Sequence, residues 1–179
     1  MKTTQILIAG FGGQGVLFAG KFLAYKGLLE DLQVSWLPSY GPEMRGGTAN
    51  CSVILSEDPV GSPIITEPDV LIAMNLPSLQ KYVNAVVPGG QIYLDSTLIA
   101  EKVDRTDVDV FYIPATQMAK DEGITTLANM IIVGSLLENN PELSFEGAAE
   151  TVQKLVPAKK AALVELNLKA LELGKTYRA

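Results

Sequence analysis

A glycine-rich turn near the start of the chain constrains the fold more than any other feature. The turn reads GFGGQG at residues 10–15, follows the apolar run Gln5–Ala9, and precedes helical spacing from Val16 to about Asp31. This G-x-G-x-x-G spacing gathers backbone N–H groups and a helix N-terminus at one point, which suits a phosphate. The first glycine is expected to make the turn, the second to clear a Cβ from the ligand's path, and the third to let the helix pack on the strand. Alternatively, the glycines only form a tight connection.

Strand-like and helical segments alternate after the turn. The expected strands cover residues 33–37, 49–55, 70–73, 91–95 and 108–113, the last with strict alternation, and the expected helices cover 77–87, 115–122, 127–138, 145–155 and 158–174. Pro38 is expected to end the second strand, which completes a first βαβ unit. Strands separated by helices predict a doubly wound, mostly parallel, Rossmann-like α/β sheet in three layers with C-terminal helices. We expect residues 1–179 to form one module.

Two C-terminal helices carry more apolar surface than one contact needs. Residues 127–137 are apolar nearly all round, which predicts burial on more than one side. The last helix has two apolar stripes, Leu163, Leu166, Ala170 and Leu173, and Val164, Leu168 and Leu171. One stripe either packs within the domain or meets another chain, and the pattern leaves both alternatives open.

Composition excludes several classes of function. The chain has 179 residues, a formal net charge of −6 and no basic run longer than Lys159-Lys160, which disfavours nucleic acid as a partner. No stretch approaches the roughly 20 apolar residues that span a bilayer, so we expect a cytoplasmic protein without a membrane segment. The absence of histidine removes the commonest metal ligand and general base. Cys51, the single cysteine, and Trp36 are expected in the core.

The end of the second predicted strand argues against a dinucleotide cofactor. NAD or FAD binding requires an acidic residue about 20 residues past the glycine turn. The residues at that place are Ser35, Trp36, Leu37, Pro38 and Ser39. Because neither a carboxylate nor an arginine is present there, a stand-alone Rossmann-type oxidoreductase is disfavoured, although it stays an alternative. An unrelated α/β binding or scaffold module is a second alternative.

A second glycine-rich loop follows the same strand. It reads SYGPEMRGG at residues 39–47, and its place after a strand predicts that it lies beside the first turn at the carboxyl edge of the sheet. Arg45 offers a planar fork for a carboxylate or phosphate, and Tyr40 offers a ring or a hydroxyl. The alternatives are a surface pair between Arg45 and Glu43 and an ordinary exposed tyrosine.

Taken together, these motifs resemble a known family. The strings GFGGQG, SYGPEMRGG, TEPDVLIAMN at residues 66–75 and LANMIIVGSLL at residues 127–137 are similar to those of the gamma subunit of 2-oxoacid:ferredoxin oxidoreductases, over essentially the full length. The resemblance implies an enzyme of anaerobic metabolism that converts a 2-oxoacid and coenzyme A into acyl-CoA and CO₂ while reducing ferredoxin. It leaves the 2-oxoacid open, with 2-oxoglutarate or a branched-chain acid favoured over pyruvate.

The resemblance also implies partners. Such chemistry uses thiamine diphosphate with magnesium and 4Fe-4S clusters. One cysteine cannot ligate a cluster, so these groups are expected on alpha and beta (thiamine-binding) subunits and a ferredoxin-like delta subunit. The chain itself is expected to bind no cofactor or metal, to hold no catalytic residue, and to be inactive alone, where it pairs with a second copy or stays single.

The residues expected to face coenzyme A or the partner subunits come from the two loops and one later helix. They are Gly10, Gly12, Gly13, Gln14, Gly15, Ser39, Tyr40, Gly41, Pro42, Glu43, Arg45, Gly46, Gly47 and Asn129. Asn129 is expected either to hydrogen-bond in the same region or to cap its own helix. Scaffolding of the thiamine-containing subunits, with help in positioning coenzyme A, is therefore the function that the sequence predicts.

Overall fold

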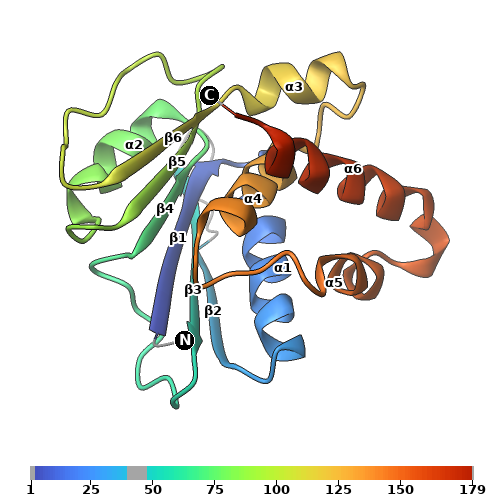
Figure 1. The fold of residues 1–179 in the computed structure, drawn as a ribbon, viewed down its shortest axis with the longest axis horizontal. Coiled ribbons are helices and arrows are strands. Elements are labelled where there is room, and N and C mark those ends of the chain that lie inside the picture. The colour runs from blue at the N-terminus through green and yellow to red at the C-terminus, as the bar shows by residue number, and fades with distance from the viewer. Residues whose placement is uncertain (1–2, 40–47, 179) are drawn as a thin grey trace.

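Six strands form one mixed sheet in the computed structural model, which describes residues 3–39 and 48–178 (Figure 1). The strands are β1 (Thr3–Phe11), β2 (Gln33–Ser39), β3 (Thr48–Ser56), β4 (Val70–Ala73), β5 (Gln91–Asp95) and β6 (Asp109–Ile113). Their order is β2-β3-β1-β4-β5-β6, and each neighbouring pair is parallel except the two that contain β3. The predicted mostly parallel, Rossmann-like sheet is confirmed.

The first βαβ unit differs from the predicted one. Strand β3 lies between β1 and β2 and is antiparallel to both, so β1 and β2 are not neighbours in the sheet. A short connection joins antiparallel strands directly, so β2 and β3 pair as neighbours and set β2 at the sheet edge. The prediction that Pro38 ends the second strand is wrong, because the strand continues to Ser39. A strand at the edge of a sheet tolerates a residue that lacks an N–H group.

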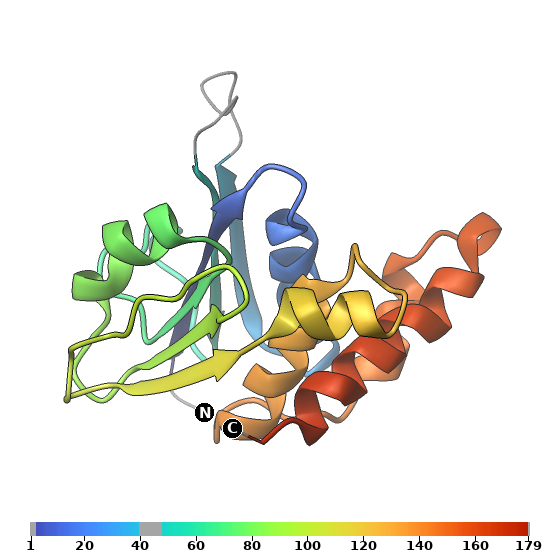
Figure 2. The same cartoon turned by 90° about the horizontal axis from the view of Figure 1, so that it is seen from above.

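Helices cover both faces of the sheet. They are α1 (Val16–Leu29), α2 (Leu76–Tyr82) with the 3₁₀ turn η2 (Val83–Ala85), α3 (Ala115–Asp121), α4 (Ala128–Asn139), α5 (Ala148–Leu155), the 3₁₀ turn η3 (Ala158–Lys160) and α6 (Ala162–Thr176). Figure 2 shows α2 on one side of the sheet and α1, α3, α4 and α6 on the other, which confirms the three layers. None of the helices in the described residues is long and apolar enough to cross a membrane.

Alternate residues of the central strands supply two cores. Ile6 and Ile8 of β1 belong to the larger core under α1 and α4, whereas Leu7 packs into a smaller core with Leu79 of α2. This division follows from the two-residue period of a strand that is covered on both faces. The alternation predicted for residues 108–113 is confirmed at the sheet edge, since Val110 and Tyr112 pack on the smaller core, whereas Phe111 and Ile113 lie on the side of the larger one.

Helix α4 lies at the centre of the larger core. Its residues Ala128–Leu137 are all buried, as the all-round apolar pattern predicts. Gly134 and Gly174 let α4 and α6 touch backbone to backbone, because a Cβ at Gly134 would overlap the Leu171 carbonyl and one at Gly174 would overlap the Ile131 carbonyl. Two small residues thus set the distance between these helices.

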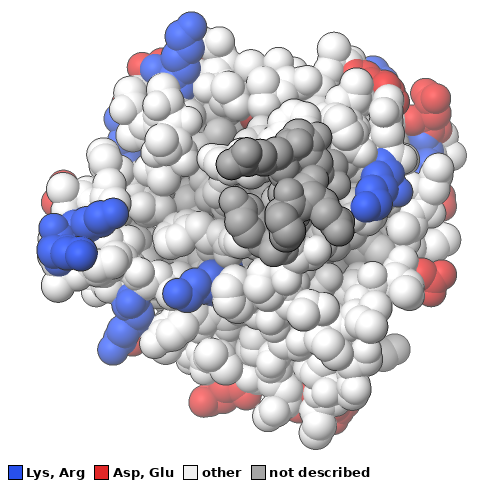
Figure 3. All heavy atoms as spheres, turned by 180° about the vertical axis from the view of Figure 1, so that it is seen from behind, with Lys and Arg blue, Asp and Glu red and all other residues white. Residues whose placement is uncertain are grey.

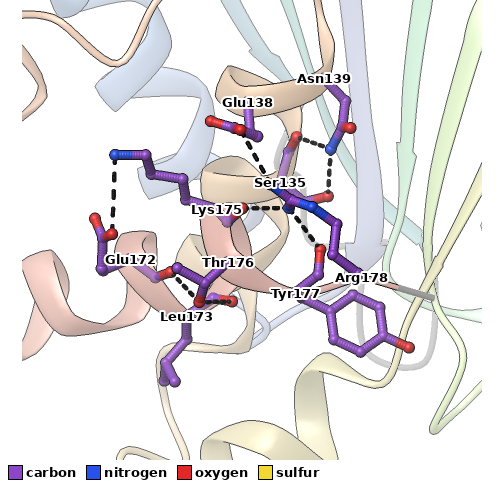
Figure 4. Close-up of polar contacts among 9 residues, drawn as sticks. All are labelled: Ser135, Glu138, Asn139, Glu172, Leu173, Lys175, Thr176, Tyr177 and Arg178. Carbon is purple, nitrogen blue, oxygen red and sulfur yellow. Dashed lines mark hydrogen bonds and ion pairs between the residues drawn. The ribbon is translucent and has the colours of Figure 1, made fainter.

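A surface ion pair joins Arg178, which follows α6, to the end of α4 (Figure 4). Arg178 donates to Glu138 Oε1 at 3.2 Å, and its side chain is 65% exposed. The contacts beside it lie within each helix and its end: Arg178 donates to the Lys175 carbonyl at 2.6 Å, and Asn139 Nδ2 donates to the Ser135 carbonyl at 2.8 Å. The close backbone packing of α4 and α6, rather than this exposed pair, therefore holds the two helices together.

The second stripe predicted on the last helix, Val164, Leu168 and Leu171, packs within the domain on the larger core. The first stripe is divided: Ala170 and Leu173 also lie on that core. Its other members, Leu163 and Leu166, remain 39% and 38% exposed. The helix also starts later than predicted, because the 3₁₀ turn η3 precedes it.

We expect Gly174→Ala to lower the free energy of unfolding by about 1–3 kcal/mol, because a backbone carbonyl of α4 cannot move aside for a methyl group. This loss occurs although alanine favours a helix by about 1 kcal/mol. Urea unfolding followed by circular dichroism measures the change. Gly61→Ala is the control, since a Cβ there meets nothing within 4 Å, and an equal effect of both variants would contradict the prediction.

Candidate functional site

The glycine turn and both ends of the second loop lie at one edge of the sheet. Phe11, the last residue of β1, pairs with Thr48, and Ser39 pairs with Asn50, which in turn pairs with Ala9. The loop therefore leaves and re-enters the sheet beside the end of β1, at the carboxyl edge where open α/β sheets bind ligands. The predicted residues Tyr40, Gly41, Pro42, Glu43, Arg45, Gly46 and Gly47 lie outside the described residues, and their roles stay predictions.

The glycines of the turn have different roles from those expected. Gly10 belongs to β1 and does not make the turn; a Cβ there would come within 2.7 Å of Met74 Cβ. The chain turns instead at Gly13 and Gly15, whose φ angles of 90° and 75° favour glycine. Gly15 contacts Asn129 of α4, so its expected role in packing the helix on the strand is wrong.

Gly12 differs from its neighbours in having no internal reason to be glycine. A Cβ at this position would meet nothing within 4 Å, its φ lies outside the left-handed region, and the residue is exposed. The surface at Gly12 is therefore open to a ligand or a partner chain.

Gln14 holds the turn in place. Its Oε1 accepts from the Phe11 N–H at 2.6 Å, and its Nε2 donates to the Met74 carbonyl at 2.9 Å. One carboxamide thus links the carboxyl ends of β1 and β4. Gln14 positions the turn and uses its polar atoms within the chain.

The N-terminus of α1 offers backbone donors at the turn. Gly15 is its N-cap residue, no side chain caps it, and the first turn has no acidic residue. The first N–H groups of an α-helix have no partner within the helix, and the helix dipole favours an anion beside them. This arrangement suits a phosphate or carboxylate.

Asn129 reaches the same turn from the far end of the sequence. Its Nδ2 donates to the Gly15 carbonyl at 3.0 Å, and Leu127 is the N-cap residue of α4. The helix-cap interpretation is therefore wrong, whereas the contact with the region of the turn is present. The side chain is 3% exposed and its Oδ1 has no partner among the described residues.

Figure 2 places the turn at the rear of the view in Figure 1, and Figure 3 shows that rear face. Lys and Arg side chains lie both at its margin and nearer its centre, and most visible Asp and Glu side chains lie toward its margin. Uncharged surface makes up most of this face, so charge does not single out the turn.

Asn75 follows β4 at this edge and was not predicted as a site residue. Its Oδ1 accepts from the Ser78 N–H at 2.9 Å and caps α2. The Nδ2 atom is buried without a partner among the described residues. The asparagine that closes TEPDVLIAMN, directly before a proline-led helix, was the signal in the sequence.

A hollow of about 660 Å³ lies at the opposite edge, among the amino ends of the strands. Internal hydrogen bonds occupy its lining: Gln91 Nε2 donates to the Asn139 carbonyl at 3.2 Å, and Asn140 Nδ2 donates to Gln91 Oε1 at 2.8 Å. These polar groups are satisfied within the chain, so we place no site there.

Cys51 is a core residue, as predicted. It is fully buried, and its thiol donates to the Val16 carbonyl at 3.4 Å. Burial raises the pKa of the thiol from 9.0 to about 12, so it stays protonated at neutral pH. Trp36 contradicts its prediction: it is 38% exposed on the edge strand β2, where only one side of the sheet shields it.

We expect native Cys51 to resist iodoacetamide at pH about 9. Only the thiolate reacts, and the raised pKa keeps the thiol protonated at this pH. Unfolding restores the ordinary pKa and rapid labelling. The unfolded thiol ionises first, so its contribution to stability is full below pH about 9 and is lost as the pH rises toward about 12. Mass spectrometry of native and denatured samples checks the labelling, with Cys51→Ala as the blank. Rapid labelling of the native chain would be inconsistent with this assignment.

The fold and the edge together define a class of protein. This is a three-layer Rossmann-like module that presents backbone donors, and among its described residues no group of three or more His, Cys, Asp or Glu is placed to hold a metal. The chain belongs to the pyruvate ferredoxin/flavodoxin oxidoreductase family, whose model matches residues 5–177. The predicted family is thus confirmed.

Three known proteins show the extent of the similarity. Subunit VorA of the ketoisovalerate oxidoreductase of Methanothermobacter thermautotrophicus is 38% identical over 173 residues, which are 97% of this chain and 36% of that protein. The chain thus spans about a third of the length of this relative. The gamma subunit of a keto/oxoacid ferredoxin oxidoreductase from Geobacter sulfurreducens PCA has a TM-score of 0.81 and 29% identity, with 96% of both chains covered.

The third is the 2-oxoglutarate:ferredoxin oxidoreductase of Magnetococcus marinus, solved with 2-oxoglutarate, coenzyme A and succinyl-CoA bound. It matches with a TM-score of 0.87 and 25% identity over 98% of this chain and 31% of that one. The module thus occurs both as a separate subunit and as part of a longer chain.

Proposed function

We propose that residues 1–179 act as one non-redox gamma module of a multi-subunit 2-oxoacid:ferredoxin oxidoreductase. The enzyme converts a 2-oxoacid, coenzyme A and oxidised ferredoxin into acyl-CoA, CO₂ and reduced ferredoxin. Family membership supports the reaction class. The observation that carries the proposal is a donor-rich sheet edge in a chain without histidine and with its one cysteine buried.

The redox chemistry belongs to other subunits under this proposal. Alpha and beta subunits hold thiamine diphosphate and magnesium, and a ferredoxin-like delta subunit holds 4Fe-4S clusters. A cluster takes four thiolates, and this chain has one cysteine, which desolvation keeps protonated. The assembly is cytoplasmic, and its substrate is 2-oxoglutarate or a branched-chain 2-oxoacid.

The glycine turn helps to position coenzyme A in this assembly. The open surface at Gly12 and the uncapped N-terminus of α1 supply amides for its phosphates, and Asn129 supports the turn from behind. We propose that Ser39, together with Arg45 and the other residues of the second glycine-rich loop, contacts the thiamine-containing subunits. A stand-alone nucleotide-binding oxidoreductase fits less well, because β3 separates the end of β2 from the turn.

Affinity purification of the tagged chain from its native host tests the assembly. We expect larger partner subunits and a brown iron–sulfur colour, because the redox centres reside on the partners. The isolated chain should show no turnover of a 2-oxoacid. A colourless single protein that reduces or oxidises a nicotinamide nucleotide would favour the stand-alone alternative.

We expect Gly12→Asp to raise the KM for coenzyme A in the assembled enzyme about tenfold or more, because a carboxylate would repel phosphates at the turn. The fold is preserved, since the position is open and an acidic group suits a helix N-terminus. Gly61→Asp is the matched control, at another exposed glycine with open space around it. Steady-state kinetics against each substrate measure the effect, and an unchanged KM for coenzyme A with intact assembly would count against the ligand role.

A further inference from the structure

An apolar pocket of about 280 Å³ opens between the N-termini of α1 and α4 and the connection from α5 to α6. Apolar residues supply most of its lining, namely Phe18, Leu127, Leu155, Val156, Pro157 and Leu163. Of these six only Val156 is buried, whereas the others are half-buried or exposed. The pocket therefore presents carbon surface to the outside and has room for one large apolar side chain.

Helix α6 extends this apolar surface beyond the pocket. Leu166 follows Leu163 by three positions and so lies on the same side of the helix. The two side chains are 38% and 39% exposed, and neither belongs to the two cores. Glu165 lies two positions after Leu163 and thus points elsewhere. Single surface leucines are ordinary, but two beside an apolar pocket indicate an interaction site.

The rim of the pocket is basic in an otherwise acidic chain. Residues 151–161 contain three lysines and no Asp or Glu, although the whole chain has 20 acidic and 14 basic residues. Lys160 lines the pocket, Lys159 lies beside it on η3, and Lys154 precedes the lining residue Leu155. All three lysines are exposed, and none has an ion pair within the described part of the chain.

The figures agree with this local charge. Figure 1 places the connection from α5 to α6 at the right of the molecule, and Figure 3, seen from behind, shows Lys and Arg side chains gathered at the corresponding left margin. Their sign is opposite to the net charge of −6. An apolar side chain flanked by carboxylates complements both parts of this surface, because the pocket excludes water and the rim attracts anions.

A partner subunit supplies such a segment better than a second copy of the chain does. The most exposed large apolar side chain that the structure describes is that of Ile64, 66% exposed in an acidic loop at residues 57–69. This loop lies at the amino edge of the sheet, between the end of β3 and the start of β4. Its insertion into the pocket of another copy would join different surfaces head to tail, which builds rings or filaments.

We infer that this pocket is the docking site for an acidic segment of a partner subunit. The segment inserts one apolar side chain beside Leu163, and its carboxylates lie against Lys154, Lys159 and Lys160. The inference rests on the proposed function, in which the chain works inside a larger enzyme. It adds a contact surface on the helical side of the module to the one proposed for the second glycine-rich loop.

Competition for the partner subunits tests the apolar part of the site. A tagged variant and the untagged wild-type chain are produced together with the partners, and mass spectrometry measures the tagged fraction of the assembled enzyme. We expect Leu163→Glu to be under-represented at least about tenfold, because a carboxylate is not accommodated in an apolar pocket. Ile64→Glu is the matched control at another exposed apolar residue and should compete as the wild type does.

The half-exposed position of Leu163 favours a folded variant, which circular dichroism checks. If Leu163→Glu does not fold, Leu163→Ala replaces it, with an expected loss of about fivefold. A folded Leu163 variant that competes equally with the wild type would overturn the inference.

The same competition tests the basic rim. We expect Lys160→Glu to be under-represented about fivefold, because it places a carboxylate against the carboxylates of the partner. Lys160→Arg keeps the charge and should compete normally. Lys120→Glu, at an exposed lysine of α3, is the control for charge reversal as such. Equal losses for the reversals at Lys160 and Lys120 would contradict a specific role of the rim.

Three outcomes separate this inference from the proposed function. If no partner subunit accompanies the wild-type chain, the proposed function fails and the docking site with it. If partners are present but Leu163→Glu and Lys160→Glu compete normally, the docking site alone is wrong. If Leu163→Glu and Ile64→Glu change only the oligomeric state of the isolated chain, measured by light scattering, the pocket holds a second copy and the partner assignment is overturned.

Discussion

The hydrogen bond from Asn129 to the Gly15 carbonyl is the contact on which the candidate site depends. It joins residues separated by 114 positions and places the N-terminus of the buried helix α4 against the N-terminus of α1. A side chain at Gly15 would overlap the carboxamide, and the left-handed backbone there already favours glycine. The turn therefore keeps its shape because the core helix behind it cannot move.

Burial of α4 explains why this helix makes such a rigid support. It lies between the sheet and α6, and Gly134 and Gly174 bring the two helices into backbone contact. Gln14 braces the turn from the other side through the ends of β1 and β4. The donor groups at the edge are thus preorganised by the core, and no residue of the turn needs to rearrange before it meets an anion.

Local patterns predicted much of this architecture. The strands at 70–73 and 91–95 have their predicted bounds, because short apolar runs between turn residues indicate buried strands. The place of β3 was not predictable in this way, since strand order depends on pairing between distant segments. Trp36 was misassigned because its apolar character says nothing about whether its strand is central or at an edge.

The site shows the same division between local and distant information. Glycine spacing predicted the turn and its backbone donors, but the roles of Gly10 and Gly15 depend on Met74 and Asn129, which approach from other elements. Asn129 was singled out from its motif, whereas its contact with Gly15 required the fold.

The proline in β2 has a consequence for the chain before it meets any partner. Trp36 and Leu37 of the edge strand β2 are 38% and 42% exposed. An exposed edge strand can pair with a strand from a second copy of the chain. Pro38 removes one of the N–H groups that such an addition needs, and its ring obstructs close approach. The proline therefore makes β2 a poorer template for a further strand than an edge with an unbroken row of N–H groups.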